Sequence, residues 1–157
     1  VLRDEFRAAG KVLGLSESNI HLFPFRVRRF PAVRQDILET LIQLRNDLAP
    51  EVVFLPSPND IHQDHHVVAV EGMRAFKSAT LLAYEMVQNS FTFQANCFLT
   101  LEERHLEAKG KAMGCYRSQI GRNYFGQERL KALATVRGLQ TGSRYAEAFE
   151  CLRLILA

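Results

Sequence analysis

The sequence predicts an α/β fold, a Rossmann-like three-layer sandwich with a mostly parallel sheet. Helical and extended patterns alternate along the 157 residues. One extended pattern, "VVFLP" at 52–56, is a continuous apolar run, which is typical of a parallel strand covered on both faces, and "LLAYE" at 81–85 is expected to be another buried strand. No internal repeat or low-complexity linker interrupts the chain, so we expect residues 1–157 to form one domain.

The first half of the chain is expected to surround its strands with three helices. Apolar residues spaced by three and four positions predict the first helix, and Gly14 favours its end. Pro31 suits the first turn of the second helix, because a backbone N–H has no helical partner there. The expected segments are a helix over 2–13, a short strand over 19–25, a helix from Pro31 to about Leu48, a strand over 52–56 and a helix from Asp64 to Phe76.

The second half is expected to alternate in the same way. Thr100 followed by Glu103 is a capping-box pattern, which predicts the start of a long helix. The last apolar segment, 145–156, fits a strand or a helix. The expected segments are strands over 81–85 and 90–101, a helix over 100–119, a helix over 127–138 that ends at Gly138, and this last segment.

Charge and composition narrow the range of partners and locations. The net charge is +3, with acidic and basic residues mixed along the chain, which argues against a nucleic-acid partner. No apolar stretch approaches the roughly 20 residues that a transmembrane helix needs. The cysteines are odd in number and far apart, which favours free thiols in a reducing compartment and therefore a cytoplasmic location. They are Cys97, Cys115 and Cys151.

The stretch "NDIHQDHH" at 59–66 holds three of the five histidines and follows the first apolar run. Sites in open α/β sheets lie beyond the carboxyl ends of the strands. His65 can offer a neutral imidazole nitrogen to a divalent metal, while His62 can hold a proton and stabilise an oxyanion beside it. Either Asp60 or Asp64 can bond the far ring nitrogen of a histidine. Alternatively, Asp64 can cap the helix that follows.

Residue chemistry alone leaves this site incomplete, because a catalytic zinc usually has three protein ligands and the loop supplies at most two. A different metal site would need dispersed carboxylates such as Asp36, Asp47 and Glu85, but no pattern aligns them with the loop. The glycine-bearing segment 137–145 lacks a phosphate-binding pattern and is interpreted as a surface loop. Packing and helix capping are the expected roles of Tyr116, Ser118 and Gln119.

Several segments together resemble the PIG-L/LmbE-like family of zinc-dependent N-deacetylases. The stretch "PSPNDIHQDHHVVAVEGMRAF" is similar to the second signature of that family, and "RDEFRAAGKVLG" to its Arg/Glu-containing helix. Two later segments, "KGKAMGCYRSQ" and "RYAEAFE", resemble its Tyr-x-Ser-Gln and Ala-Glu-x-Phe segments. The resemblance implies the fold of the family, hydrolysis of an N-acetyl amide on an N-acetylglucosamine-type sugar conjugate, and Zn²⁺ as the cofactor.

The resemblance also implies a role for each matched residue. His65 would ligate the zinc, and His62 would stabilise the tetrahedral oxyanion and protonate the leaving amine. Asp64 would pair with a histidine and orient it, so that His62 and Asp64 are the implied catalytic residues. Asp60 matches an acidic position ahead of these residues and would support them. Arg3 corresponds to an arginine that contacts the substrate.

One element of the family has no counterpart, the Ala-His-Pro-Asp-Asp-Glu-like loop that supplies two zinc ligands and the general base. We therefore expect a domain without this loop and without the N-terminal strand that precedes it. Two functions are compatible with that expectation. One is a metal-dependent N-deacetylase that acts on a small N-acetylated sugar or glycoconjugate and assembles into homo-oligomers. The alternative is a catalytically inactive relative that acts as a binding or scaffold module.

Overall fold

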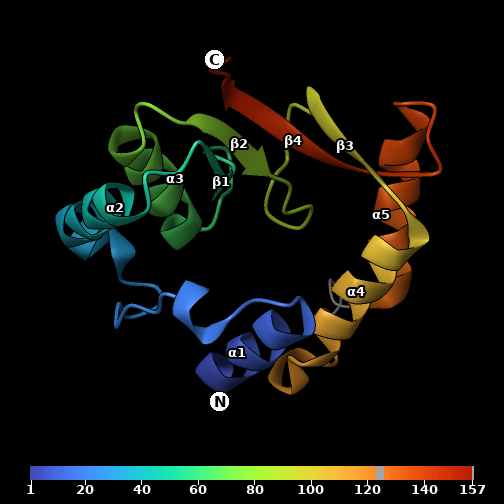
Figure 1. Cartoon of the computed structure of the whole chain (residues 1–157), viewed down its shortest axis with the longest axis horizontal. Helices are drawn as coiled ribbons and strands as arrows, with labels where there is room; N and C mark the ends of the chain where they lie inside the picture. Colours follow the sequence, from blue (N-terminus) through green and yellow to red (C-terminus); the bar gives the residue numbers. More distant parts are fainter. Residues whose placement is uncertain (123–125, 157) are drawn as a thin grey trace. The chain divides into compact units, whose positions relative to one another are not determined.

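The structure is a computed structural model that describes residues 1–122 and 126–156. The chain divides into two compact units, each of which is described by itself (Figure 1). Unit 1 comprises Val1–Pro24 and Phe98–Glu147, and unit 2 comprises Phe25–Cys97 and Ala148–Ala157. The single domain expected over residues 1–157 stays a prediction.

The strands within the described residues form one mixed sheet in the order β1-β2-β4-β3. Strand β1 pairs with β2 in parallel, and β4 pairs with β2 in the antiparallel sense. The α/β class is therefore confirmed, whereas the expectation of a mostly parallel sheet is wrong. The segment "YAEAFECLR" contains three charged residues, Glu147, Glu150 and Arg153, whereas parallel strands covered on both faces are near-continuous apolar runs. The strands are β1 (Val52–Pro56), β2 (Thr80–Tyr84), β3 (Cys97–Leu101) and β4 (Tyr145–Arg153).

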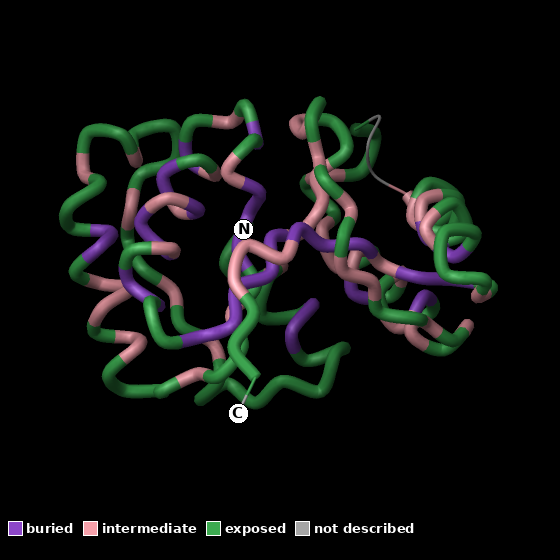
Figure 2. The backbone as a smooth tube through the Cα atoms, turned by 90° about the horizontal axis from the view of Figure 1, so that it is seen from above, coloured by how far each residue is buried: buried purple, intermediate pink, exposed green. Residues whose placement is uncertain are grey.

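Unit 2 has a helical layer made of α2 (Arg34–Leu48) and α3 (Gln63–Ala75). Helix α3 packs on β1, and α2 packs on α3. Gly72 allows α3 to lie close to the strand, because a Cβ atom there would be 2.6 Å from Cδ2 of Leu55. Buried residues are frequent in α3, β2 and β4, and Figure 2 shows how buried and exposed stretches alternate along the backbone. The buried apolar cluster consists of Leu38, Leu55, Ala75, Phe76, Ala79 and Leu81.

Unit 1 contains the helices α1 (Leu2–Val12), α4 (Glu103–Gly114) and α5 (Gln127–Leu139). Helix α1 packs against α4, and α4 packs against α5. The buried cluster of this unit is small and comprises Leu106, Ala134 and Tyr145. Most of α1 is exposed, since only Ala9 and Gly10 are buried among its residues (Figure 2). Unit 1 therefore depends more on surface contacts than unit 2 does.

The structure corrects the expectation for one segment, 19–25, and decides the one that was left open for another, 145–156. The strand expected over 19–25 is wrong, because a 3-10 turn at Glu17–Asn19 leads into irregular backbone there. The ambiguous segment 145–156 is a strand for its first nine residues, which lie in β4. Among the helices of the described residues, none is both long and apolar enough to cross a membrane.

The capping box of α4 begins two residues later than expected. The side chain of Glu102 accepts from the backbone of His105, and the His105 side chain accepts from the backbone N–H of Glu102. The predicted pair, Thr100 and Glu103, is therefore wrong. Strand β3 continues to Leu101, so the chain is still extended at Thr100 and the helix can begin only after it.

Candidate functional site

The histidine loop, residues 57–66, begins at the edge of the sheet where the two parallel strands end. Parallel pairing places Pro56 opposite Tyr84, so the segments that follow β1 and β2 start side by side. A backbone hydrogen bond of 3.1 Å joins these segments, from the N–H of Ile61 to the carbonyl of Asn89. The loop therefore lies where α/β proteins commonly place their sites, beyond the carboxyl ends of parallel strands.

Asp60 is the carboxylate that organises this loop. Its side chain is fully buried. Oδ1 accepts the backbone N–H of His62 at 2.7 Å, and Oδ2 lies 2.7 Å from Nδ1 of His65. Nδ2 of Asn89 approaches the same Oδ2 at 3.5 Å. A buried carboxylate is stable only when donors surround it, so these contacts fix the turn of the loop and the ring of His65 together.

In their neutral form, two of the three histidines of the loop, His62 and His65, take opposite tautomers. Nδ1 of His62 accepts the backbone N–H of Asp64 at 3.2 Å, so this nitrogen carries no proton and Nε2 carries it. Nδ1 of His65 faces a carboxylate, which can only accept, so here Nδ1 carries the proton and Nε2 has a free lone pair. The rings stack with their centroids 4.5 Å apart. The loop thus presents one ring N–H donor beside one ring acceptor.

Asp64 is buried at the start of α3, and its partners are backbone groups rather than a histidine ring. Its carboxylate accepts from the N–H of Arg28 and, at 3.3 Å, from the N–H of Phe30. The side chain that caps α3 belongs to His62. Of the two carboxylates that the sequence left open, Asp60 is the one that bonds a ring nitrogen, and Asp64 anchors the segment that precedes α2.

Tyr84 is a neighbour of this loop that sequence reasoning missed. It ends β2, and burial raises the pKa of its phenol, with a further increase from the negative charge of Asp60. The phenol is therefore protonated at neutral pH. Its only signal in the sequence is its position near the end of an apolar run, which does not distinguish it from a core residue.

Arg3 and the matched segment "KGKAMGCYRSQ" lie in unit 1. Arg3 is exposed on α1. On the same helix, Glu5 accepts from the hydroxyl of Ser118 at 2.6 Å and from its backbone N–H at 2.8 Å, and these bonds lower the pKa of the Glu5 carboxyl. Two segments that carried the resemblance are thus in contact, although 113 residues separate Glu5 from Ser118.

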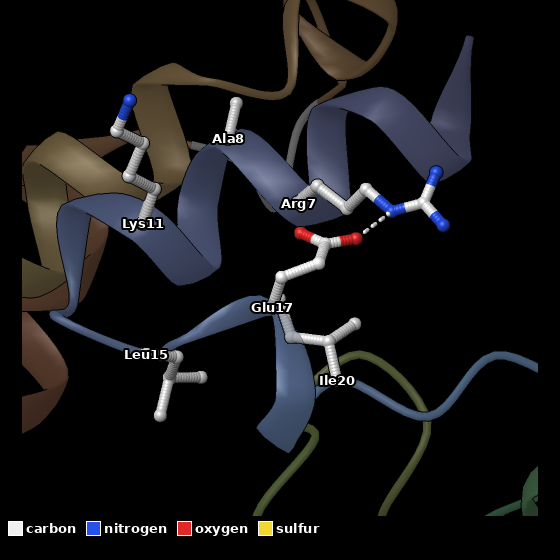
Figure 3. Close-up of a pocket in the computed structure, with 6 residues that line it drawn as sticks. All are labelled: Arg7, Ala8, Lys11, Leu15, Glu17 and Ile20. Atoms are coloured by element: carbon white, nitrogen blue, oxygen red, sulfur yellow. Dashed lines mark ion pairs between the residues drawn. The ribbon is translucent and has the colours of Figure 1, made fainter.

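Each unit has a pocket, and neither pocket is lined by a predicted site residue. On unit 1, Arg7 and Glu17 point toward each other in a pocket of about 350 Å³, with Nε and Oε1 2.6 Å apart (Figure 3). On unit 2, a pocket of about 400 Å³ is lined by residues that include Arg45 and Phe76. No group of three or more His, Cys, Asp or Glu side chains within residues 1–122 and 126–156 is arranged to hold a metal ion.

Comparisons with solved structures find the same fold. GalB, the 4-carboxy-2-hydroxymuconate hydratase from Pseudomonas putida KT2440, is 20% identical with a TM-score of 0.72, over 99% of this chain and 72% of its own. The N,N'-diacetylchitobiose deacetylase from Pyrococcus horikoshii is 20% identical with a TM-score of 0.65, over 96% and 62%. The zinc-inhibited form of teicoplanin deacetylase Orf2 is 16% identical with a TM-score of 0.66, over 94% and 71%. At these identities the likeness concerns the fold, which serves a hydratase as well as deacetylases.

Sequence comparison adds the family. No curated protein sequence matches the chain. The model of the GlcNAc-PI de-N-acetylase family, PIG-L, matches residues 1–76, a range that contains α1, α2, β1 and the entire histidine loop. The predicted resemblance is therefore confirmed, and the chain matches the PIG-L family of GlcNAc-PI de-N-acetylases over residues 1–76.

Proposed function

We propose that this protein is a metal-dependent N-deacetylase, which hydrolyses the N-acetyl amide of an N-acetylglucosamine-type sugar conjugate. The observation that carries the proposal is the pair of opposite tautomers at His62 and His65. A ring N–H donor beside a ring lone pair suits a reaction that needs both a hydrogen-bond donor and a metal ligand. The PIG-L match supports the same reaction, as do the deacetylases among the structural neighbours.

Zinc is the proposed cofactor, and His65 is its proposed ligand. The lone pair on Nε2 fits a metal, and the Asp60 carboxylate on Nδ1 is the usual companion of a metal-bound histidine, which it orients and makes more basic. A catalytic zinc usually takes three protein ligands, and no group of three or more His, Cys, Asp or Glu side chains among the described residues is arranged to hold a metal ion. When bound, zinc acts as a Lewis acid that activates water and polarises the amide carbonyl.

His62 is the proposed hydrogen-bond donor to the oxyanion of the reaction. Hydrolysis of an amide places negative charge on the carbonyl oxygen and requires a proton for the departing amine. The Nε2–H of His62 can donate a hydrogen bond to that oxygen. A neutral imidazole is too weak an acid to release this proton, so the amine takes its proton from the water that is consumed in the reaction. Asp64 contributes by holding the backbone that leads into α2, and its N–H bond to Nδ1 keeps His62 in the donor tautomer.

Several finer points belong to the same proposal. Arg3 is exposed and carries a permanent positive charge, which suits a contact with a polar or anionic sugar substituent. The three cysteines are free, which supports a cytoplasmic location. Assembly into homo-oligomers is proposed from the resemblance.

The alternative function is a catalytically inactive binding or scaffold module, because the described residues do not complete a zinc site.

The test compares His65→Ala with His66→Ala in the protein that carries this chain. The ring of His66 is exposed and bonds the Pro58 carbonyl, so its removal leaves the Asp60 contacts intact. Acetate release from an N-acetylglucosamine conjugate and bound metal are measured with zinc and with other divalent ions. We expect His65→Ala to lose most of the metal and at least about 100-fold in turnover. His66→Ala should stay within about twofold of the wild type.

A third variant separates the two histidines. His62→Ala should keep its metal and lose about 100-fold in kcat, because it removes a donor to the developing charge. Unchanged metal content and turnover in His65→Ala would contradict the assignment of the ligand. A wild-type protein that releases no acetate with any divalent ion would instead favour the inactive binding module.

A further inference from the structure

Glu150, on strand β4, is a charged residue in the interior of unit 2. It is only 4% exposed. Its Oε2 accepts the hydroxyl of Ser57 at 2.6 Å, and its Oε1 accepts the backbone N–H of Gln94 at 2.7 Å. A carboxylate at this depth is costly unless donors satisfy it. The two donors come from the two segments that follow β1 and β2, so one side chain joins both segments.

Ser57 connects Glu150 to the histidine loop through further hydrogen bonds. It is completely buried and directly follows β1. Its hydroxyl oxygen also accepts the backbone N–H of Asn59 at 3.1 Å, and its carbonyl accepts the N–H of Asp60 at 3.0 Å. Donating to Glu150 fixes the direction of the Ser57 hydroxyl and leaves its lone pairs for Asn59. Glu150 therefore fixes, through Ser57, the turn that positions Asp60 in the histidine loop.

The sheet fixes Glu150 in this place. Glu150 lies opposite Ala83 in the antiparallel register, and its neighbour Phe149 lies opposite Tyr84. Gln94, which donates to Glu150, belongs to the same segment as Asn89, which approaches Asp60. A rigid strand thus supports both sides of the loop, and supports of this kind determine how precisely a functional side chain is placed.

We propose that Glu150 is a positioning residue that acts through Ser57 and Asp60 on the ring of His65. The inference extends the proposed function and rests on it for its effect on catalysis. Each step in the path is a hydrogen bond between buried or half-buried groups: Glu150 to Ser57, Ser57 to the backbone of Asp60, and Asp60 to Nδ1 of His65. Loss of Glu150 would leave the donors of Ser57 and Gln94 without their acceptor and free the turn to move.

The experiment uses Glu150→Ala, Glu150→Gln and the control Glu147→Gln in the protein that carries this chain. Glu147 lies on the same strand, but its partner is Lys109 in unit 1. NMR of ¹⁵N-labelled histidine reports the tautomer of His65, and steady-state kinetics report kcat and KM. We expect Glu150→Ala to mix the two tautomers of His65 and to lower kcat about 10-fold with KM within about twofold.

The amide of Glu150→Gln has the same shape and keeps an acceptor for Gln94, so we expect the Nδ1–H tautomer and kcat within about threefold of the wild type. Glu147→Gln should change neither quantity. A folded Glu150→Ala with an unchanged tautomer and kcat would overturn the proposal. If that variant does not fold, Ser57→Ala decides, and an unchanged His65 tautomer there overturns the proposal equally. A wild type without acetate release refutes the proposed function, while the tautomer comparison still tests Glu150.

Discussion

The two units use their carboxylates in opposite ways. In unit 2, four acidic side chains are between 0% and 4% exposed, and backbone, hydroxyl, imidazole or guanidinium donors satisfy each of them. In unit 1, the paired acids lie at the surface, where Glu102 and Glu103 are 66% and 40% exposed. The buried set comprises Asp60, Asp64, Glu71 and Glu150.

The contrast matters because the same hydrogen bond or ion pair contributes differently to the free energy of unfolding at an exposed site and at a buried one. Water solvates an exposed carboxylate whether or not its partner is present, so most exposed ion pairs add little to stability. A buried carboxylate that loses a partner keeps its desolvation cost and has nothing to offset it. Each buried acid of unit 2 therefore constrains the segments that donate to it. Two of these acids, Asp60 and Asp64, lie in the histidine loop, and Glu150 bonds Ser57 of the same loop.

The largest expected effect comes from removing a partner of Glu71. Arg34 donates to it through Nε at 2.8 Å, and Arg74 donates through Nη1 at 2.5 Å. We expect Arg34→Met to lower the free energy of unfolding by about 3 kcal/mol in urea denaturation, because Glu71 stays buried with one partner fewer. Arg104→Met, which removes the partner of exposed Glu102, should change stability within measurement error. Equal losses in both variants would refute the comparison.

A smaller loss is expected at Asp64, which links stability to the site. Asp64→Ala removes the acceptor of two backbone N–H groups, those of Arg28 and Phe30, and we expect it to cost about 2 kcal/mol. Asp64→Asn keeps one acceptor oxygen and should cost about half of that. The two variants are compared by thermal and urea unfolding. A fully stable Asp64→Ala would mean that this buried acid does not anchor the segment.

Much of unit 2 could be predicted from the sequence, because its signals are local. The run at 52–56 is apolar throughout, and the run at 81–85 is apolar up to Tyr84. A loop between a strand and a helix follows from the change in periodicity. The placement of β4 could not be predicted, since strand pairing depends on contacts far apart in the chain. Its antiparallel partner β2 lies about 65 residues earlier, and nothing in either segment specifies the other.

The same distinction applies to the site. His62 and His65 could be singled out because they lie in one short stretch with carboxylates around them. Which carboxylate bonds a ring could not be decided, because Asp60 and Asp64 both lie within reach and the turn at Ser57 selects Asp60. Glu150 carried no signal at all, since its partner Ser57 is 93 residues away.

Unit 1 contains a close backbone contact at Gly138, which involves packing rather than charge. A Cβ atom at Gly138 would lie 2.7 Å from the carbonyl oxygen of Ser143, whereas one at Gly72 would lie 2.6 Å from Cδ2 of Leu55, a buried side chain of the core. We expect Gly138→Ala to cost about 1 kcal/mol net, after the gain of alanine in a helix is counted. Gly72→Ala should also destabilise the fold, because the packed side chain of Leu55 must shift to make room. Thermal unfolding measures both, and a stabilised Gly138→Ala would show that the 138–143 turn can move aside.

The smallest expected effect is a pH dependence of unit 1 at Glu5. The hydroxyl and the backbone N–H of Ser118 lower the pKa of Glu5 below its usual 4.5 in the folded protein. A folded-state pKa that is lower than the unfolded one adds stability above about pH 4.5, and this stability disappears as the pH falls through the lowered value. The stability difference between wild type and Glu5→Gln should therefore shrink between about pH 5 and pH 3 in urea denaturation. Ser118→Ala should reduce the same difference in part, because it removes the hydroxyl but keeps the N–H. A difference that is constant with pH would show that this exposed contact does not contribute to folding, and would make the contrast with the buried acids of unit 2 still sharper.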